Sequence, residues 1–292
     1  MNRSTASNLC AVLALAAGTV VAAQQIPYEP AKQFGSGITG AFEGWYANPD
    51  GSHTFLVGYL NRNRAQEVAV PIGPNNRIEP GGPDQGQPAH FLPARQVGMF
   101  TVTVPKEFTV QQRLTWSITV NGQTNSIPLR LHPDYNISPF KDSAVGNTPP
   151  VLRLFDESGA GVQGPIAALT KAIARSASVS TPLQLPLWAN DDAKFTSLTN
   201  APMTKPRPVV TLTWSKYRGP GTVTFDNARP RVDVLAGGMQ DQPFRGTSMT
   251  TATFSEPGEY ILHVTANDYS GAGGGGEVCC WTTALVKVNV TP

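Results

Sequence analysis

The sequence predicts an all-β protein built from two β-sandwich domains in tandem. Gly (28) and Pro (26) are so frequent among the 292 residues that they interrupt most candidate helices. Charged residues make up 14% of the chain, whereas soluble domains usually carry about 25%, and long helices need such residues. Short segments of alternating apolar and polar residues recur between turn signals, which is typical of β-sandwiches.

The N-terminal residues predict an export signal. An apolar run from Leu9 to Ala23 follows Arg3, and Val21-Ala22-Ala23 places small residues directly before Gln24. This pattern is typical of a cleaved signal peptide over residues 1–23, and the run is too short for a transmembrane helix. We therefore expect a secreted or periplasmic protein without a transmembrane segment after cleavage.

Turn composition divides the remaining chain into two parts. We expect an N-terminal β-sandwich at residues 24–140, a linker rich in Pro and Gly at 141–164, and a second sandwich at 165–292. The Pro- and Gly-rich stretch from Gly73 to Pro93 predicts a long loop without an inner strand. The Ala-rich stretch at 167–177 predicts one or two helical turns.

A hairpin around Asn121-Gly122 is the best-specified local structure. A type I′ turn requires positive φ angles at both central residues, which Asn and Gly tolerate. A two-residue loop would place Trp116 opposite Ile127 and Leu114 opposite Leu129. The apolar side chains of both strands then face the same side of the sheet.

Three motifs in the second half resemble a known family. They are Asn190-Asp191-Asp192, Trp214 within Leu212–Phe225, and Pro257-Gly258 followed by Tyr260 within Thr251–Asp268. Residues 165–292 thereby resemble the PKD-like and cadherin-like modules of bacterial surface proteins. The resemblance implies an immunoglobulin-like sandwich with a buried Trp214 and a Tyr260 at a turn. The first half is similar to the N-terminal part of uncharacterised exported bacterial proteins, and this resemblance implies no activity.

Aspartates near the ends of predicted strands are candidate cation ligands. Asp191, Asp192 and Asp268 would lie in end loops of the sandwich, and Ca²⁺ prefers six to eight oxygen ligands. The alternative is that each carboxylate accepts hydrogen bonds from its own turn. Calcium is the only cofactor that the sequence suggests.

Export would leave two cysteines, Cys279 and Cys280, which are neighbours in the sequence. One interpretation is a vicinal disulfide that locks a turn beside Trp281. Reduced or intermolecularly paired thiols are the alternative, and a redox or metal role has less support because no Cys-x-x-Cys spacing occurs.

Aromatic residues near Asn- and Asp-rich loops are candidate ligand contacts. Trp45, Tyr46 and Tyr59 could form a platform that binds a glycan, although ordinary core packing also explains Trp45.

The chemistry of the chain favours a noncatalytic function. A net charge of +2 gives no basis for binding nucleic acid by charge, and neither H-E-x-x-H nor G-x-S-x-G occurs. The first hypothesis is an exported binding or spacer protein of the cell surface or periplasm, whose partner is an unknown protein or glycan. The alternatives are a carbohydrate-binding module and, behind it, a secreted hydrolase. A hydrolase would bring His90, Asp84 and a serine together in one cleft.

Overall fold

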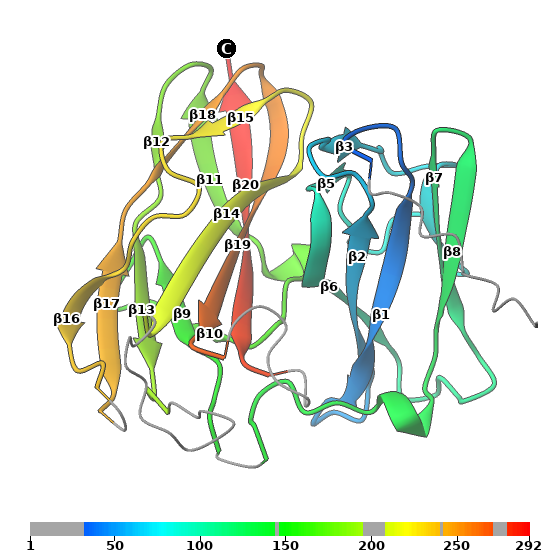
Figure 1. The fold of residues 1–292 in the computed structure, drawn as a ribbon, viewed down its shortest axis with the longest axis horizontal. Helices are drawn as coiled ribbons and strands as arrows, with labels where there is room; N and C mark the ends of the chain where they lie inside the picture. The colour runs from blue at the N-terminus through cyan, green and yellow to red at the C-terminus, as the bar shows by residue number, and fades with distance from the viewer. Residues whose placement is uncertain (1–31, 144–145, 195–207, 240–241, 271–278) are drawn as a thin grey trace, which may run out of the picture. The chain divides into compact units, whose positions relative to one another are not determined.

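The strands of two β-sandwiches dominate the structure, a computed structural model that describes residues 32–143, 146–194, 208–239, 242–270 and 279–292 (Figure 1). The expected signal peptide lies outside the described residues. Neither of the two 3-10 helices in the described part is long or apolar enough to cross a membrane. Apart from two short 3-10 helices, the regular structure of the described residues consists of strands, which confirms the all-β prediction.

The first sandwich consists of two three-stranded antiparallel sheets and a short ladder. One sheet has the order β1 (Ile38–Ala47), β2 (His53–Asn61), β6 (Ala94–Val104), and the other has β4 (Asn76–Glu79), β7 (Leu114–Val120), β8 (Gln123–Leu129). The ladder pairs β3 (Val68–Ala69) with β5 (His90–Phe91), and the 3-10 helix η1 (Pro133–Tyr135) follows β8. This order matches strands A-B-E and C-F-G of the immunoglobulin fold.

The predicted hairpin connects β7 and β8. Asn121 and Gly122 have φ angles of 52° and 75°, and Trp116 pairs with Ile127 as Leu114 does with Leu129. Turn type and register are both as expected, because each depends on neighbouring residues alone. The buried Trp116 ring then anchors the core of the first sandwich.

The Pro- and Gly-rich stretch from Gly73 to Pro93 is more ordered than the sequence suggests. It contains β4, which pairs with β7 at the edge of the sheet. The amide Nδ2 of the buried Asn76 donates to the carbonyl oxygens of Val70 (2.9 Å) and Pro88 (2.7 Å). An edge position tolerates the flanking prolines, because only one side of the strand must offer its N–H groups.

The second sandwich places a five-stranded sheet opposite a four-stranded sheet. The first has the order β10 (Val162–Gln163), β9 (Val151–Leu154), β13 (Leu187–Asp191), β17 (Phe244–Ser248), β16 (Asp233–Ala236). The second, called here the central sheet, has β11 (Ile173–Ser178), β20 (Trp281–Thr291), β19 (Gly258–Asp268), β14 (Val210–Arg218). A small sheet of β12 (Leu183–Gln184), β18 (Thr251–Phe254) and β15 (Val223–Phe225) lies beside them. The strands β9-β13-β17-β16 and β20-β19-β14 correspond to A-B-E-D and G-F-C of the immunoglobulin fold.

Two segments differ from their predicted local structure. Part of the expected linker at 141–164 forms β9 and β10, and β9 pairs with β13. The Ala-rich stretch at 167–177 forms only a 3-10 turn, η2 (Leu169–Lys171), before β11 pairs in parallel with β20. Tertiary pairing with a buried strand here outweighs the helix propensity of alanine.

The two aromatic residues of the family resemblance lie in the core of the second sandwich. Trp214 on β14 is 2% exposed. The Tyr260 hydroxyl donates to the carbonyl oxygen of Glu256 (2.9 Å) and accepts from the amide of Gly221 (3.0 Å). A tyrosine near the start of strand F whose hydroxyl returns to the upstream backbone is a feature of immunoglobulin-like domains.

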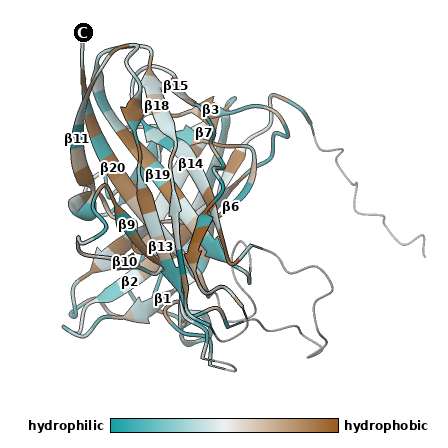
Figure 2. Cartoon of the chain, turned by 90° about the vertical axis from the view of Figure 1, so that its left-hand side faces the viewer, coloured by the Kyte–Doolittle hydropathy of each residue, from teal (hydrophilic) through white to brown (hydrophobic). Residues whose placement is uncertain are grey.

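The two middle strands of the central sheet, β19 and β20, are buried on both faces over much of their length. All residues from Tyr260 to Val264 on β19 and from Trp281 to Val286 on β20 are buried, and both strands show long apolar stretches (Figure 2). Alternate side chains such as Leu262 fill the core of the second sandwich. The intervening side chains, Tyr217, Ile261 and Leu285, belong to the core of the first. The central sheet therefore contributes side chains to two hydrophobic cores, one on each of its faces.

His263 lies on the face of the central sheet that meets the first sandwich. Its side chain is 1% exposed, and its ring stacks on Tyr217 with the centroids 5.8 Å apart. Burial lowers the pKa of His263 to about 4, so the ring is neutral at pH 7. The face of β19 opposite Tyr260 therefore serves as an interface between the two sandwiches.

Hydrogen bonds reinforce the contact between the sandwiches. The Arg218 guanidinium donates two hydrogen bonds of 2.9 Å to the carboxylate of Asp84 and also donates to the carbonyl oxygen of Gln87. Backbone bonds run from Ala89 N to Tyr217 O (3.1 Å) and from Thr101 N to the carbonyl oxygen of Ala167 (3.1 Å). Residues 31–292 accordingly form one compact unit.

We predict that Arg218→Ala lowers the free energy of unfolding by about 2 kcal/mol, because it leaves Asp84 and a backbone carbonyl without a charged donor. Urea denaturation measures this change. Arg231→Ala is the matched control: its side chain is 86% exposed and lies 3.7 Å from Asp233, so we expect a change within about 0.5 kcal/mol. Equal losses in both variants would contradict the prediction.

Candidate functional sites

The three candidate cation ligands lie near one another at one end of the second sandwich. Asp191 is the last residue of β13 and Asp268 is the last residue of β19. Burial is the main cause that raises the pKa of Asp191 and Asp268, and the charge of a neighbouring aspartate adds to it: Asp268 and Asp192 act on Asp191, and Asp192 acts on Asp268. The structure thus assembles the predicted aspartates into one group, called here the aspartate cluster.

Each aspartate accepts a hydrogen bond from the backbone two residues further on. The donors are Ala193 N to Asp191 (2.8 Å), Lys194 N to Asp192 (3.2 Å) and Ser270 N to Asp268 (2.8 Å). These are the turns that short acidic side chains form with their own backbone. The hydrogen bonds expected of a turn therefore account for one of the two oxygens of each carboxylate.

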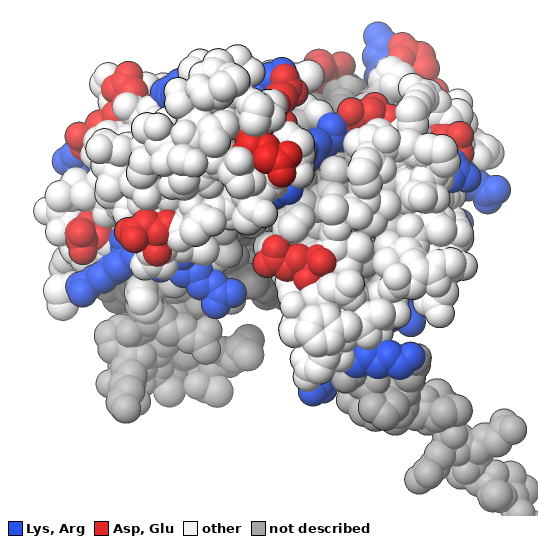
Figure 3. Space-filling model, turned by 90° about the horizontal axis from the view of Figure 1, so that it is seen from above, with Lys and Arg blue, Asp and Glu red and all other residues white. Residues whose placement is uncertain are grey.

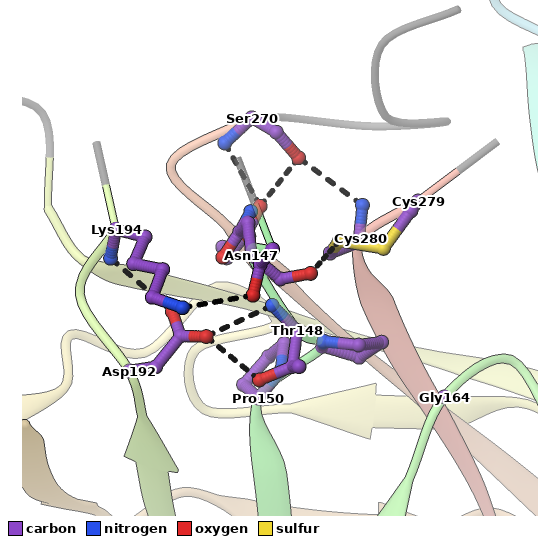
Figure 4. Close-up of a disulfide and its surroundings, with 12 residues drawn as sticks. Asn147, Thr148, Pro150, Gly164, Asp192, Lys194, Ser270, Cys279 and Cys280 are labelled. Carbon is purple, nitrogen blue, oxygen red and sulfur yellow. Dashed lines mark hydrogen bonds between the residues drawn. A yellow bond between two sulfur atoms is a disulfide. The ribbon is translucent and has the colours of Figure 1, made fainter. Parts of the chain in front are cut away.

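The opposite oxygens of two aspartates bind residues that precede β9. Asp192 Oδ2 accepts from the amide (3.0 Å) and hydroxyl (2.8 Å) of Thr148, and Asp268 Oδ2 accepts from Asn147 Nδ2 (2.6 Å) (Figure 4). Sequence reasoning missed both partners because it assigned them to a linker. The Asn-Thr-Pro sequence before β9 carries no signal of this contact.

Burial raises the pKa of two of the three aspartates. Desolvation raises the pKa of Asp191 to about 7, and it also raises that of Asp268. Asp191 Oδ2 and Asn147 Oδ1 are buried and have no hydrogen-bond partner among the residues that the structure describes. Among the described residues, no group of three or more His, Cys, Asp or Glu side chains is arranged to hold a metal ion. Calcium binding stays a prediction.

The vicinal disulfide is present and adjoins the aspartate cluster. Cys279 and Cys280 are bonded to each other and are 3% and 0% exposed. The amide of Cys280 donates to Ser270 Oγ (3.2 Å), and its sulfur lies 3.5 Å from the carbonyl oxygen of Asn147. Figure 4 shows that Ser270 and Asn147 both lie against the disulfide. The disulfide therefore braces the residues that bind Asp268.

The three candidate aromatic contacts do not form a platform. Tyr59 is 0% exposed, and its hydroxyl accepts from Leu92 N (2.8 Å). Tyr46 is 8% exposed and meets the Phe140 ring edge to face, with the centroids 5.1 Å apart. Trp45 is partly buried, and its indole N–H donates to the carbonyl oxygen of His132 (2.8 Å). Tyr46 and Tyr59 thus pack inward, as the core-packing alternative expects of an aromatic residue, and glycan binding by these three residues stays a prediction.

A cleft of about 490 Å³ is lined by residues of both sandwiches. In its lining, His90 Nε2 lies 2.8 Å from Glu67 Oε2, and this hydrogen bond lowers the pKa of Glu67. Lys216 lines the other side, where burial lowers its pKa. Asp84 does not join them, because Arg218 binds its carboxylate and lowers its pKa. The structure thus separates the His and Asp that a hydrolase would bring together.

Comparisons with known proteins do not assign this chain to a family. No protein-family model matches the chain, and neither does any curated protein. Among solved structures, the chain is similar to domains 4 and 5 of the S-layer protein SbsC, at 11% identity over 62% of this chain with a TM-score of 0.22. It spans 66%, just under two thirds, of that structure.

Two further solved structures are similar over more of the chain. A titin fragment is 12% identical over 87% of this chain and 99% of its own, with a TM-score of 0.22. Rst D1-D2 is 10% identical over 87% of this chain and 100% of its own, with a TM-score of 0.26. TM-scores this low carry no argument, so the immunoglobulin-like assignment depends on the strand order described above.

We predict that Asp191→Asn changes how stability varies with pH. The pKa of Asp191 is about 7 in the folded chain and 3.8 in the absence of burial. Between these values the folded chain binds a proton that the unfolded chain lacks, so stability from this group is present at low pH and lost as pH rises toward 7. The free energy of unfolding, wild type minus variant, should therefore fall by at most about 1.4 kcal/mol per pH unit between pH 4 and 7.

Urea denaturation across this pH range measures the difference. Asp134→Asn serves as the control because its side chain is 82% exposed, and it should leave the pH profile unchanged. A difference in unfolding free energy between wild type and Asp191→Asn that does not change with pH would contradict the burial argument.

A parallel series with CaCl₂ tests the calcium prediction. Calcium binding requires that CaCl₂ raise the Tm of the wild type near pH 7 and leave the Tm of Asp191→Asn unchanged.

Proposed function

We propose that this protein is a noncatalytic binding or spacer protein that acts outside the cytoplasm. The observation that carries the proposal is the interface between the sandwiches. Tyr217 and His263 of the second sandwich are buried against the first, and Arg218 binds Asp84 across it. An interface of this kind holds two modules in one arrangement, which suits a protein that presents or spaces a surface.

Titratable residues that would support hydrolysis serve structural roles instead. His90 pairs with Glu67, Asp84 pairs with Arg218, and the ring of His263 is buried between the sandwiches. These pairings favour a binding protein over the hydrolase. The inward packing of Tyr46 and Tyr59 likewise weakens the proposal of a carbohydrate-binding module.

Secretion or a periplasmic location is part of the proposal. The predicted signal peptide at 1–23 supports it, and so does the Cys279–Cys280 disulfide, because disulfides persist in oxidising compartments. The resemblance to PKD-like and cadherin-like modules supports a place at the cell surface. Lys and Arg side chains are interspersed with Asp and Glu on the face drawn in Figure 3, and a protein or glycan partner suits such a surface better than nucleic acid.

Backbone ¹⁵N relaxation of the purified protein tests the proposal. We expect the same rotational correlation time for amides of both sandwiches, because the shared interface makes them tumble together. Clearly shorter and different times for the two sandwiches would contradict a spacer with a fixed arrangement.

A panel of chromogenic esters and glycosides tests the rival hydrolase. We expect no turnover above the buffer blank. Turnover that disappears in His90→Ala, while circular dichroism shows the variant folded, would overturn the noncatalytic proposal.

A further inference from the structure

The cleft between the two sandwiches is large enough for a small ligand and opens to solvent. Its volume is about 490 Å³, and ligand sites in proteins usually measure about 300–1,000 Å³. The first sandwich supplies one wall from β5 and the start of β6, and the second supplies the other from β14, β15 and residues 228–229. Glu67, Thr222 and Arg229 mark its mouth, because all three are exposed lining residues.

Partly buried apolar side chains line both walls of the cleft. Leu92 and Pro93 lie on the first wall, and Val223 and Phe225 lie on the second. The Phe225 ring packs beside Trp214, with the centroids 6.5 Å apart, and Trp214 belongs to the core of the second sandwich. This contact holds the Phe225 ring in the wall, where it offers an apolar surface. Such a surface suits the C–H face of a sugar ring, which gains from leaving water as other apolar groups do.

Hydrogen-bond donors and acceptors are mixed in the lining of the cleft. Glu67 Oε2 lies 2.8 Å from His90 Nε2, and the Glu67 side chain is 55% exposed, so its carboxylate can accept further hydrogen bonds. Gln96 Nε2 donates to the carbonyl oxygen of Pro93 (2.8 Å), and Lys216 Nζ donates to another backbone carbonyl. Each of these two groups carries at least one more N–H. Hydroxyl groups match such a lining, because they both donate and accept.

One positive charge of the cleft has no acidic partner in the described part of the chain. Burial lowers the pKa of Lys216, while the charges of Glu256 and Glu67 raise it, so Lys216 already has two acidic neighbours. Arg218 pairs with an aspartate, but Arg229 forms no ion pair with any residue that the structure describes. A guanidinium binds a carboxylate through two parallel hydrogen bonds. The cleft therefore suits a hydroxyl-rich ligand that also carries a carboxylate.

We propose that this cleft binds a uronic-acid oligosaccharide. The Arg229 guanidinium binds a carboxylate of the ligand at the mouth, Glu67 and Gln96 bind its hydroxyls, and a ring face covers Phe225. The aromatic residues Trp45, Tyr46 and Tyr59 take no part, because none of them lines the cleft. This inference names a partner class for the binding role proposed above and rests on it. A chain whose sandwiches tumble together but that binds no uronate would overturn this inference alone.

Isothermal titration calorimetry of the full chain tests this proposal. The probes are the disaccharides of galacturonate, mannuronate, guluronate and glucuronate, which share carboxylates and hydroxyls and differ in stereochemistry. We expect saturable binding of at least one of them at pH 7. The methyl ester of the tightest-binding probe should bind at least about tenfold more weakly, because it keeps the hydroxyls and lacks the charge that Arg229 binds.

Variants at the mouth of the cleft separate this site from nonspecific attraction. Arg229→Gln should weaken binding of the acid at least about tenfold and abolish the preference for the acid over the ester. Thr222→Trp should weaken binding of both, because the indole occupies the cleft. Arg231→Gln is the matched control, since Arg231 is 86% exposed and does not line the cleft, and it should bind like the wild type. All three positions are exposed, so circular dichroism should show unchanged folds.

Three results would overturn the proposal. The first is that none of the four uronate disaccharides binds saturably. The second is that the methyl ester binds the wild type as tightly as the acid does. The third is that Arg231→Gln weakens binding as much as Arg229→Gln, which would show that the sugar follows the overall charge of the protein and not this cleft.

Discussion

The burial of β19 and β20, the middle strands of the central sheet, on both faces is the constraint on which the rest of the structure depends. Leu262 and its alternate neighbours fill one core, while Ile261 and Leu285 fill the other. Each such side chain contributes about 1.5–3 kcal/mol when it is fully removed from water. Separating the sandwiches would expose this second face. The contact between them is therefore part of the hydrophobic core.

This arrangement determines where a partner can bind. With both faces of β19 and β20 covered, the central sheet has only its ends and its two edge strands, β11 and β14, to offer. One end carries the aspartate cluster, which Asn147 and the disulfide close. At the β14 edge, Val210 and Leu212 are 2% and 3% exposed, so the backbone of this strand is covered as well.

Burial of ionisable groups gives the fold opposing responses to pH. His263 is kept neutral by burial, so the stability it contributes declines as pH falls from about 6.5 toward 4. The raised pKa of Asp191 acts in the opposite direction over an overlapping range. His263 lies on β19 of the central sheet and Asp191 at the end of β13 in the opposite sheet, so their effects should add.

Features set by neighbouring residues could be predicted from the sequence. The Asn121-Gly122 turn fixes the hairpin register, and the Pro257-Gly258 turn positions Tyr260. β4 and β9 could not be found, because each is four residues long and is held by a distant strand within Pro- and Gly-rich sequence. Tyr59 was misread for a related reason: β2 is buried on both faces, which removes the alternation that marks an inward side chain.

Differential scanning calorimetry of the purified chain tests the shared core most directly. If the central sheet belongs to both cores, the protein unfolds in a single transition whose calorimetric and van't Hoff enthalpies agree. Two separate transitions, one for each sandwich, would show that the cores are independent and would contradict this account.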